Sequence, residues 1–342
     1  MESNRSASLR TIADIVGVHP STVSRALKDP KSARIAPQTV DRIRQVAKEH
    51  GYAPNAWAKS LRTRRSMMVG LTMPRLTDTG LAQMFDAAQR RALELGYQTV
   101  LVASEHAADP EAAMQRLLDG RTDGLIISTA HLRSPDLDRL ERSGVPFVLL
   151  NRSSGPHPGV FGDDLQGGRL AAEHLVQLGH RRIGSLAGPA DVSTGHLRLK
   201  GFRQVLAEAG ISVNERWLAT TSLDVKPAVA AAHAVLSRRD RPTALVTVND
   251  TVAIAAMSVA RDLGLRVPQD LSVVGYNDSE LAGLMSPPLT SVRVPIQAMG
   301  TAAVDLLVRR IAGEPISSTV FTPVLIRRQS TAPPPASAAG DR

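Results

Sequence analysis

The chain has 342 residues, of which 43% are hydrophobic and 21% are charged, a composition typical of globular proteins and a length sufficient for two or three domains. It contains no cysteine, which excludes disulfides, thiolate nucleophiles and cysteine-ligated metal sites. No apolar run is long enough to span a bilayer, and the opening residues lack the apolar stretch of a signal peptide, so we expect a cytoplasmic protein without membrane contact.

The positive charge is concentrated near the N-terminus. Residues 1–66 hold 13 Lys and Arg against 5 Asp and Glu, and the rest of the chain is nearly balanced although the whole carries +9. A compact basic segment on a neutral body favours a unit that binds a polyanion, most often nucleic acid. The alternative is a solvated basic surface that binds nothing.

The basic segment begins with two short predicted helices. Residues 8–18 have apolar side chains at helical spacing, with Ser8 placed to cap the helix and Gly17 suited to the left-handed residue that ends it. Pro20 fits the first position of a second helix, where no N–H is needed. The tight turn between the two helices indicates a helix-turn-helix.

The second helix has two unlike sides. Val23, Ala26 and Leu27 fall at helical spacing and predict a side that packs on its neighbours. The other side carries short hydroxyls and one arginine, namely Ser21, Thr22, Ser24 and Arg25. Short hydroxyls let the backbone approach DNA phosphates and can donate hydrogen bonds, and an arginine can reach guanine O6 and N7.

A third helix is predicted between Pro37 and Gly51, with its inner face formed by Val40, Ile43, Val46 and Ala47. We therefore place a helix-turn-helix unit at residues 1–51 and a hinge at residues 52–66. The hinge has good helix formers after Pro54, but one or two turns are marginal alone in water. The alternative for the hinge is a plain charged linker.

The body, which we place at residues 67–331, alternates short apolar runs with amphipathic stretches. Buried strands are predicted at 67–74, 98–104, 123–128 and 146–151, with helices at 86–96, 110–120 and 137–144. The pattern restarts after Asp164, in 167–188, 243–250 and 271–278. Repeated strand–helix units predict parallel sheets covered by helices, and two such halves predict a bilobed body with a ligand cleft between them.

Several chemical motifs are absent or unsuitable. The chain lacks the glycine-rich loops that hold phosphates, and His174 and His180 are spaced poorly for a metal, so we expect no cofactor and no metal. The adjacent Asp163 and Asp164 are predicted to be turn or capping residues rather than an acid/base pair. Residues 332–342 are rich in Pro, Ala and Ser and are predicted to be disordered.

The stretches TIADIVGVHPSTVSRAL (11–27) and YAPNAWAKSLRTRRS (52–66) carry a specific resemblance. With EHLVQLGHRRIGSLAGP, RLKGF, VTVNDTVAIAAM, LGLRVPQDLSVVGYND and PPLTSV in the body, the chain resembles the LacI/GalR (lac-repressor/gal-repressor) family of bacterial transcription regulators from about Ser8 to Thr331. The resemblance implies a small all-α helix-turn-helix head and a bilobed α/β body of two parallel-sheet subdomains, similar to periplasmic binding proteins.

The resemblance also implies where the chain passes between the two subdomains. We place the crossings near Asp163–Asp164, Val292–Pro295 and Phe321–Pro323. The N-subdomain would then comprise about 67–163 and 294–321, and the C-subdomain about 164–292 and 323–331.

The resemblance further implies a set of DNA contacts. Pro20, Ser21 and Arg25 occupy positions that read operator bases in the family, and Leu61 occupies that of a wedge that kinks the DNA from the minor groove. Because Pro20 has no hydrogen-bonding side chain and Ser21 is short, we expect Arg25 to carry most of the specificity. The full expected set is Ser8, Leu9, Arg10, Pro20, Ser21, Thr22, Ser24, Arg25, Arg34, Asn55, Ala58, Lys59 and Leu61.

The resemblance also implies a set of effector contacts in the body: Asp78, Thr79, Arg121, Asn151, Thr194, Arg198, Asn249, Thr251 and Asn277. Asn151 and Asn277 depart from the aspartate usual in the family, so the hydrogen-bond polarity toward a ligand differs. As alternatives, Asn249 and Asn277 cap the helices that follow them, and Arg198 pairs with an acid between the lobes. Few aromatics are available to stack on a neutral sugar, which leaves room for a sugar acid, a phosphorylated sugar or a nucleoside.

We therefore predict a regulator, most simply a repressor, that binds palindromic double-stranded operator DNA as a homodimer under control of a small-molecule effector. The alternatives are a cytoplasmic small-molecule-binding protein, or a sugar-acting enzyme, of the same body fold. The basic head disfavours the first, and the lack of a nucleophile, phosphate-loop or metal constellation disfavours the second.

Replacing the expected wedge tests the hinge hypothesis. We predict that Leu61→Ala weakens operator binding and reduces the DNA bend, because no side chain then opens the central base step. The bend is measured from the mobility of circularly permuted operator fragments. A bend equal to that of the wild type would exclude the wedge.

Overall fold

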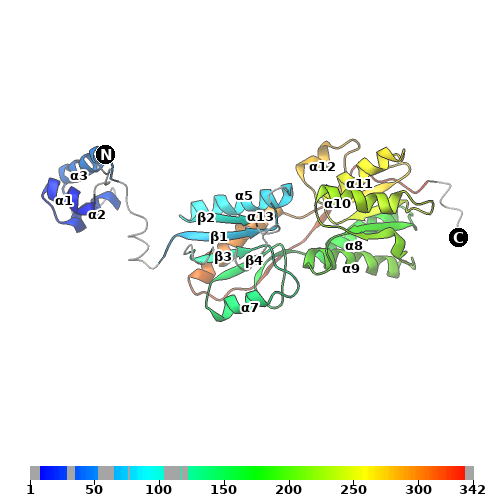
Figure 1. The fold of residues 1–342 in the computed structure, drawn as a ribbon, viewed down its shortest axis with the longest axis horizontal. Coiled ribbons are helices and arrows are strands. Elements are labelled where there is room, and N and C mark those ends of the chain that lie inside the picture. The colour runs from blue at the N-terminus through cyan, green and yellow to red at the C-terminus, as the bar shows by residue number, and fades with distance from the viewer. Residues whose placement is uncertain are drawn as a thin grey trace. The chain divides into compact units, whose positions relative to one another are not determined.

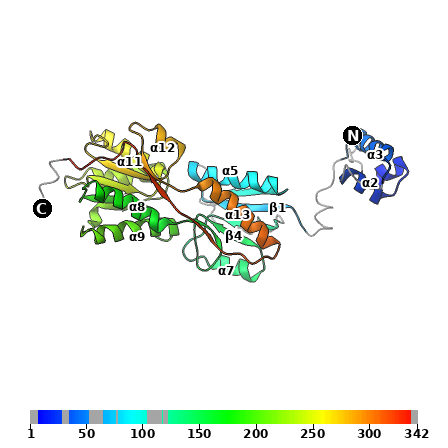
Figure 2. The ribbon, with the colours of Figure 1, turned by 180° about the vertical axis from the view of Figure 1, so that it is seen from behind.

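The computed structural model describes residues 8–28, 35–52, 65–75, 78–103, 117 and 122–335. The chain divides into an N-terminal unit ending at Ser66 and a body that begins at Met67. Figures 1 and 2 show the N-terminal unit as helices alone and the body as sheets layered with helices. The predicted fold class, an all-α head and a bilobed α/β body, is confirmed.

The head contains the three predicted helices: α1 (Leu9–Val16), α2 (Pro20–Lys28) and α3 (Pro37–Glu49). Ser8 caps α1 as expected, because its hydroxyl accepts from the Thr11 N–H while the Thr11 hydroxyl accepts from the Ser8 N–H. Gly17 ends α1 with φ of 75°, a conformation that favours glycine. The chain can therefore turn at once into α2.

A single apolar core holds these helices together. It is formed by Ile12, Ala13, Val23, Ala26, Val40, Ile43, Val46 and Ala47. Val23 and Ala26 are fully buried in it, and burial of apolar surface is the main force that orients a short helix in such a small unit. The predicted inner side of α2 is thus confirmed, and its opposite side faces solvent.

The first lobe of the body is a six-stranded sheet in the order β11-β5-β4-β3-β1-β2, with every neighbouring pair parallel. Its strands are β1 (Met68–Met73), β2 (Gln98–Ala103), β3 (Gly124–Ile127), β4 (Phe147–Leu150), β5 (Gly159–Gly162) and β11 (Thr319–Phe321). Its helices are α5 (Thr79–Glu94), α7 (Pro135–Arg142) and α13 (Ile296–Ile311).

The second lobe repeats this plan in the order β12-β10-β9-β8-β6-β7. Its strands are β6 (Ile183–Ala187), β7 (Leu218–Thr220), β8 (Ala244–Thr247), β9 (Ser272–Asn277), β10 (Thr290–Arg293) and β12 (Val324–Ile326). Its helices are α8 (Asp164–Gln177), α9 (Ser193–Glu208), the short 3-10 helix η1 (Glu215–Trp217), α10 (Val225–Leu236), α11 (Asp250–Asp262) and α12 (Glu280–Leu284).

Alternating strand residues bury both faces of each sheet. In the first lobe Ile126 packs in the same core as α5 and α13, while its neighbours Leu125 and Ile127 pack against α7. Figures 1 and 2 show α5 and α7 on opposite sides of the strands. In the second lobe Val246 packs in the core that contains α8 and α9, and Leu245 in the core of α10 and α11.

The chain passes from one sheet to the other after β5, after β10 and after β11. One apolar core includes residues of both sheets, so the lobes pack directly on each other. The four strands predicted in the first half of the body are present. One refinement is that β12 pairs antiparallel with β10, so the second sheet is not wholly parallel.

Sequence reasoning did not single out the short strands β5, β7, β11 and β12, which have three or four residues each and no clear alternation. The helix expected at 110–120 lies outside the described residues, apart from Leu117. Among the described residues no helix has the length and apolar character needed to cross a membrane. Within that same part of the chain, no group of His, Asp and Glu is arranged to hold a metal.

Two buried histidines hold the C-terminal segment against the second lobe. The His180 ring lies 2.9 Å from the Thr243 hydroxyl and, through Nε2, 2.9 Å from the carbonyl oxygen of Ala332. The Ala332 N–H donates to the Ser272 hydroxyl, so the disorder expected from residue 332 onward does not hold at its first residue. His174 lies 2.9 Å from the Thr331 hydroxyl.

We predict that the buried His174, which holds Thr331, makes the stability of the protein depend on pH. Burial, with the nearby charge of Arg327, lowers the pKa of His174 to about 4 from an ordinary 6.5. As the pH falls, the unfolded chain therefore takes up a proton on His174 at a higher pH than the folded protein does. The stabilisation is complete above about pH 6.5 and is lost as the pH falls toward 4. The loss amounts to about 1–3 kcal/mol of unfolding free energy. The test is urea unfolding of the wild type and His174→Gln across this range.

His174→Gln should show a weaker pH dependence of unfolding than the wild type. The matched control is His196→Gln, which changes an exposed histidine on α9. Equal pH dependence in the wild type and His174→Gln would contradict the assignment.

Candidate functional site

The solvent-facing side of α2 is the candidate nucleic-acid interface. Ser21 and Arg25 are exposed on it, and Thr22 and Ser24 are partly buried at its edges. The Arg25 Nε donates to the Ser21 carbonyl at 3.3 Å, which lays the arginine along the helix toward its N-terminus. The two side chains therefore present neighbouring polar groups on one surface of a basic unit.

His19, the residue before α2, contacts the candidate interface and was not singled out by sequence reasoning. Its backbone carbonyl accepts from the Thr22 N–H at 2.8 Å, and its ring Nδ1 accepts from the Ser21 N–H at 3.2 Å. The same Nδ1 lies 2.8 Å from the Ser21 hydroxyl. A polar residue directly before a helix-starting proline was the available signal, since that position caps helices.

The other predicted DNA contacts of the head differ in their surroundings. The Ser8 hydroxyl is engaged in its cap, Leu9 packs partly buried against the core of the head, and Arg10 is exposed on α1. Pro20 is partly buried at the start of α2. The remaining predicted contacts lie outside the described residues: Arg34, Asn55, Ala58, Lys59 and Leu61.

In the body, the two lobes meet through a hydrogen bond between two predicted effector contacts. The Asn249 side-chain N–H donates to the Asp78 carboxylate at 3.2 Å, and both side chains are buried. Each also caps a helix of its own lobe: Asp78 accepts from the Leu81 N–H, and Asn249 accepts from the Val252 N–H. The capping role foreseen for Asn249 is present together with this contact between lobes.

Asn277 lies close to this pair. Its amide is beside Gly80 of α5, close enough that a Cβ at that glycine would lie 3.1 Å from the Asn277 nitrogen. Asn277 has φ of 98° at the end of β9, and it does not cap α12, whose capping residue is Ser279. The carboxyl ends of β8 and β9 thus bring Asn249 and Asn277 close to the first turn of α5.

A second polar contact between the lobes is an ion pair whose arginine is buried and whose aspartate is partly exposed. Arg75, which follows β1, contacts the carboxylate of Asp224, the capping residue of α10, at 2.5 Å. Arg75 is only 6% exposed and belongs to the first lobe, whereas Asp224 belongs to the second. The sequence held no specific signal for this pair, because 149 residues separate its members. We call Asp78, Asn249, Arg75 and Asp224 the interlobe junction.

Arg198 is engaged inside the second lobe. Its Nε donates to Asp164 at 2.7 Å, its Nη1 donates to the Val248 carbonyl at 2.6 Å, and its guanidinium stacks 3.5 Å above the Tyr276 ring. Burial raises the pKa of the Asp164 carboxyl, and the Arg198 charge opposes that shift. Of the two roles expected for Arg198, pairing with an acid is present, although the acid lies in the same lobe.

The other predicted effector residues differ in how far they are buried. Thr79 is exposed at the start of α5, Thr194 is buried in the first turn of α9, and Thr251 is partly buried in that of α11. Asn151 follows β4 with φ of 68° and donates its backbone N–H to Val160. Arg121 lies outside the described residues. Asp163 caps α8 as predicted.

Comparisons with known proteins agree with this architecture. The family model described as "Bacterial regulatory proteins, lacI family" matches residues 8–55, and the "Periplasmic binding protein-like domain" matches residues 172–331. The HTH-type transcriptional repressor PurR of Photobacterium profundum is 32% identical over 95% of this chain and 98% of that protein. The HTH-type transcriptional regulator CelR of Thermobifida fusca is 34% identical over 96% and 99%.

The chain belongs to the LacI family. Solved structures of that family superimpose on it. The lac repressor dimer bound to operator and the anti-inducer ONPF has a TM-score of 0.85 with 28% identity, covering 96% of this chain and 100% of that one. The complex of CelR with cellobiose has a TM-score of 0.72 with 32% identity, covering 95% and 99%. The protein is therefore a transcriptional regulator with a helix-turn-helix head.

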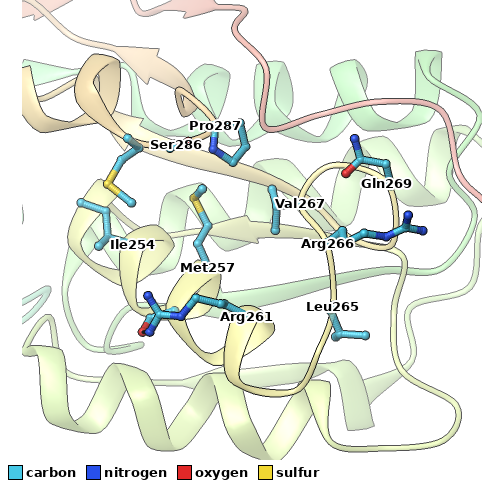
Figure 3. Close-up of a pocket in the computed structure, with 11 residues that line it drawn as sticks. Ile254, Met257, Arg261, Leu265, Arg266, Val267, Gln269, Ser286 and Pro287 are labelled. Carbon is cyan, nitrogen blue, oxygen red and sulfur yellow. Dashed lines mark hydrogen bonds between the residues drawn. The ribbon is translucent and has the colours of Figure 1, made fainter.

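This LacI-family chain also has an apolar groove on the second lobe, away from the interlobe junction. The groove has a volume of about 560 Å³ and lies along α11, beyond its first turn. Figure 3 shows Met257 of α11 facing it from one side and Ser286 and Pro287, before β10, from the other. Arg261 and Arg266 border it, and each is paired with a neighbouring aspartate.

The geometry of α2 yields a prediction for base recognition. Arg25→Ala should weaken binding to the operator by about 1–3 kcal/mol and change binding to random duplex DNA much less, because the guanidinium reads a base edge. Both affinities are measured by titrating labelled duplexes at one salt concentration. Equal losses on both duplexes would show that Arg25 contacts only phosphate.

Arg10→Ala is the matched control for this variant. It removes an exposed arginine of α1 on the same basic unit. Its loss should be similar on the two duplexes.

Proposed function

We propose that this protein binds a palindromic operator as a homodimer and represses transcription, with its operator affinity set by a small-molecule effector bound between the lobes of the body. The observation that carries the proposal is the exposed Ser21–Arg25 surface of α2, which is held outward by the burial of Val23 and Ala26. A binding protein or an enzyme of the same body fold has no use for such a surface on a basic unit.

The charge distribution supports DNA as the partner. The excess of Lys and Arg over Asp and Glu lies almost entirely within residues 1–66, where it attracts phosphates without regard to sequence. Specificity would then come from the α2 side chains in the major groove, and two heads would read two half-sites. The operator-bound lac repressor dimer, 28% identical to this chain, supports the same arrangement here. We place the protein in the cytoplasm, at the nucleoid.

The interlobe junction supports an effector site. Asp78, Asn249 and Asn277 bring carboxylate and amide groups to the carboxyl ends of strands from the second lobe and to α5 of the first, the place where α/β proteins bind small ligands. Such groups suit a ligand with several hydroxyls. We propose a sugar, a sugar acid or a related metabolite, and the CelR structure with cellobiose supports that class.

The junction also supports a means of control. Asp78 and Asn249 are bonded to each other across the lobes, so a ligand that uses their free hydrogen-bonding capacity must change that contact or build on it. The lobes would shift as rigid bodies and alter the spacing of the two hinges. Coupling of this kind is typically worth about 1–3 kcal/mol.

The groove along α11 supports a homodimer. Leu284, at the end of α12, is 80% exposed, and Leu281 on the same helix is 48% exposed, beside the groove residue Met285. Large apolar side chains exposed next to an apolar groove mark a protein interface more often than a solvated surface. A second copy of this chain can bury both the leucines and the groove.

We predict that Leu284→Glu weakens dimerisation at least tenfold, because a charge would be buried against an apolar groove. Sedimentation equilibrium of the full chain measures the dimer constant. The matched control is Val320→Glu on β11, an apolar side chain of the first lobe that is also exposed. An unchanged dimer constant for Leu284→Glu would contradict this placement of the interface.

The proposed function is tested by selecting bound sequences from random duplex DNA with the full-length protein at two salt concentrations. Recovery of a palindrome with a central pyrimidine–purine step supports the regulator and identifies the operator. Recovery of no motif, with binding that only declines as salt rises, contradicts sequence-specific control by the head in the ligand-free protein. A screen of sugars and sugar acids then tests whether a co-repressor restores the specificity.

A further inference from the structure

The contact between His19 and Ser21 determines which groups carry protons. The Ser21 backbone N–H lies 3.2 Å from Nδ1 of His19, and a backbone N–H can only donate. Nδ1 is therefore an acceptor and carries no proton. The neutral imidazole must then hold its proton on Nε2.

The assignment of Nδ1 fixes the direction of the second bond. The Ser21 Oγ lies 2.8 Å from the same Nδ1, and two atoms without a proton between them cannot form a hydrogen bond. The Ser21 hydroxyl therefore donates its only proton to His19, and it shares the single lone pair of Nδ1 with the longer bond from the Ser21 N–H. Its oxygen keeps its lone pairs, and the exposed side of Ser21 presents an acceptor rather than the donor that the sequence suggests.

We propose that His19 is a positioning residue that makes Ser21 an acceptor in the major groove, so that Ser21 reads an amino group of the operator. In that groove adenine N6 and cytosine N4 are the donors, whereas thymine O4 and guanine O6 and N7 are acceptors. Ser21 therefore favours adenine or cytosine at the base it contacts. This inference rests on the proposed function, because it requires the head to read DNA.

Arg25 extends the argument to a second base. Its guanidinium has donors alone, and the bond from Nε to the Ser21 carbonyl draws it from its own turn of α2 back toward Ser21. Ser21, as an acceptor, selects a base that donates a hydrogen bond, and Arg25, as a donor, selects a nearby base that accepts one. Without His19 the Ser21 hydroxyl proton is free to rotate toward the DNA. Ser21 could then donate or accept, and it would no longer favour adenine or cytosine at the base that it contacts.

The test selects operator sequences with four full-length proteins: the wild type, Ser21→Ala, His19→Ala and His19→Asn. Ser21→Ala identifies the base that Ser21 contacts, as the position whose preference disappears. There the wild type should favour adenine or cytosine over thymine and guanine by about three- to tenfold, the effect of one hydrogen bond. His19→Ala should reduce that ratio to about one.

His19→Asn separates positioning from simple helix capping. An asparagine oxygen can accept both the Ser21 N–H and its hydroxyl, so this variant should restore the preference. If His19 merely caps α2, His19→Ala lowers the affinity for every sequence by a similar factor and leaves the base preference intact. That result would overturn the inference.

A second measurement keeps the test valid if His19→Ala does not fold. An operator whose identified adenine or cytosine is replaced by an analogue without the exocyclic amino group should bind the wild type about three- to tenfold more weakly, and Ser21→Ala equally well as before. A palindrome with thymine or guanine at that position would overturn this inference alone. Recovery of no sequence preference would overturn the proposed function, and the inference with it.

Discussion

The buried hydrogen bond between Asp78 and Asn249 constrains how the two lobes of the body meet, together with the apolar core that they share and other polar contacts. Each of the two side chains also caps a helix of its own lobe. Neither can turn away without leaving a backbone N–H unsatisfied, which is costly when buried. The two caps therefore hold both side chains in place and fix the contact between the lobes in this structure.

The arginines around this link have structural partners. Arg198 is bound by Asp164, a carbonyl and an aromatic face, and Arg75 is bound by Asp224. Arg198 and Asp164 are both largely buried, so removing either would leave the other charge without compensation, whereas Asp224 is partly exposed. These arginines therefore help to position the ends of the strands. Asn277, at the end of a strand of the second lobe, places its amide beside Gly80 of the first lobe.

The head uses a different constraint. A small apolar core decides which side of α2 faces outward, and the basic composition of the unit supplies attraction to phosphates. Attraction of that kind is blind to sequence, so the base recognition that we propose rests on two side chains, Ser21 and Arg25, and on the residues that orient them. His19 matters because a hydroxyl that is free to rotate can be donor or acceptor, whereas one bonded to Nδ1 is committed.

Local pattern in the sequence was enough for the elements with strong periodicity. The three helices of the head, the first strands of the body, the caps at Ser8 and Asp163 and the family itself could be predicted, because each depends on residues a few positions apart. The family resemblance also singled out Asp78, Asn249 and Arg198 as candidate effector contacts. It could not pair them, since 171 residues separate Asp78 from Asn249 and 149 separate Arg75 from Asp224. Those pairings were decided by the tertiary structure, because only the fold brings groups so far apart in the sequence within hydrogen-bonding reach and buries Asp78 together with Asn249.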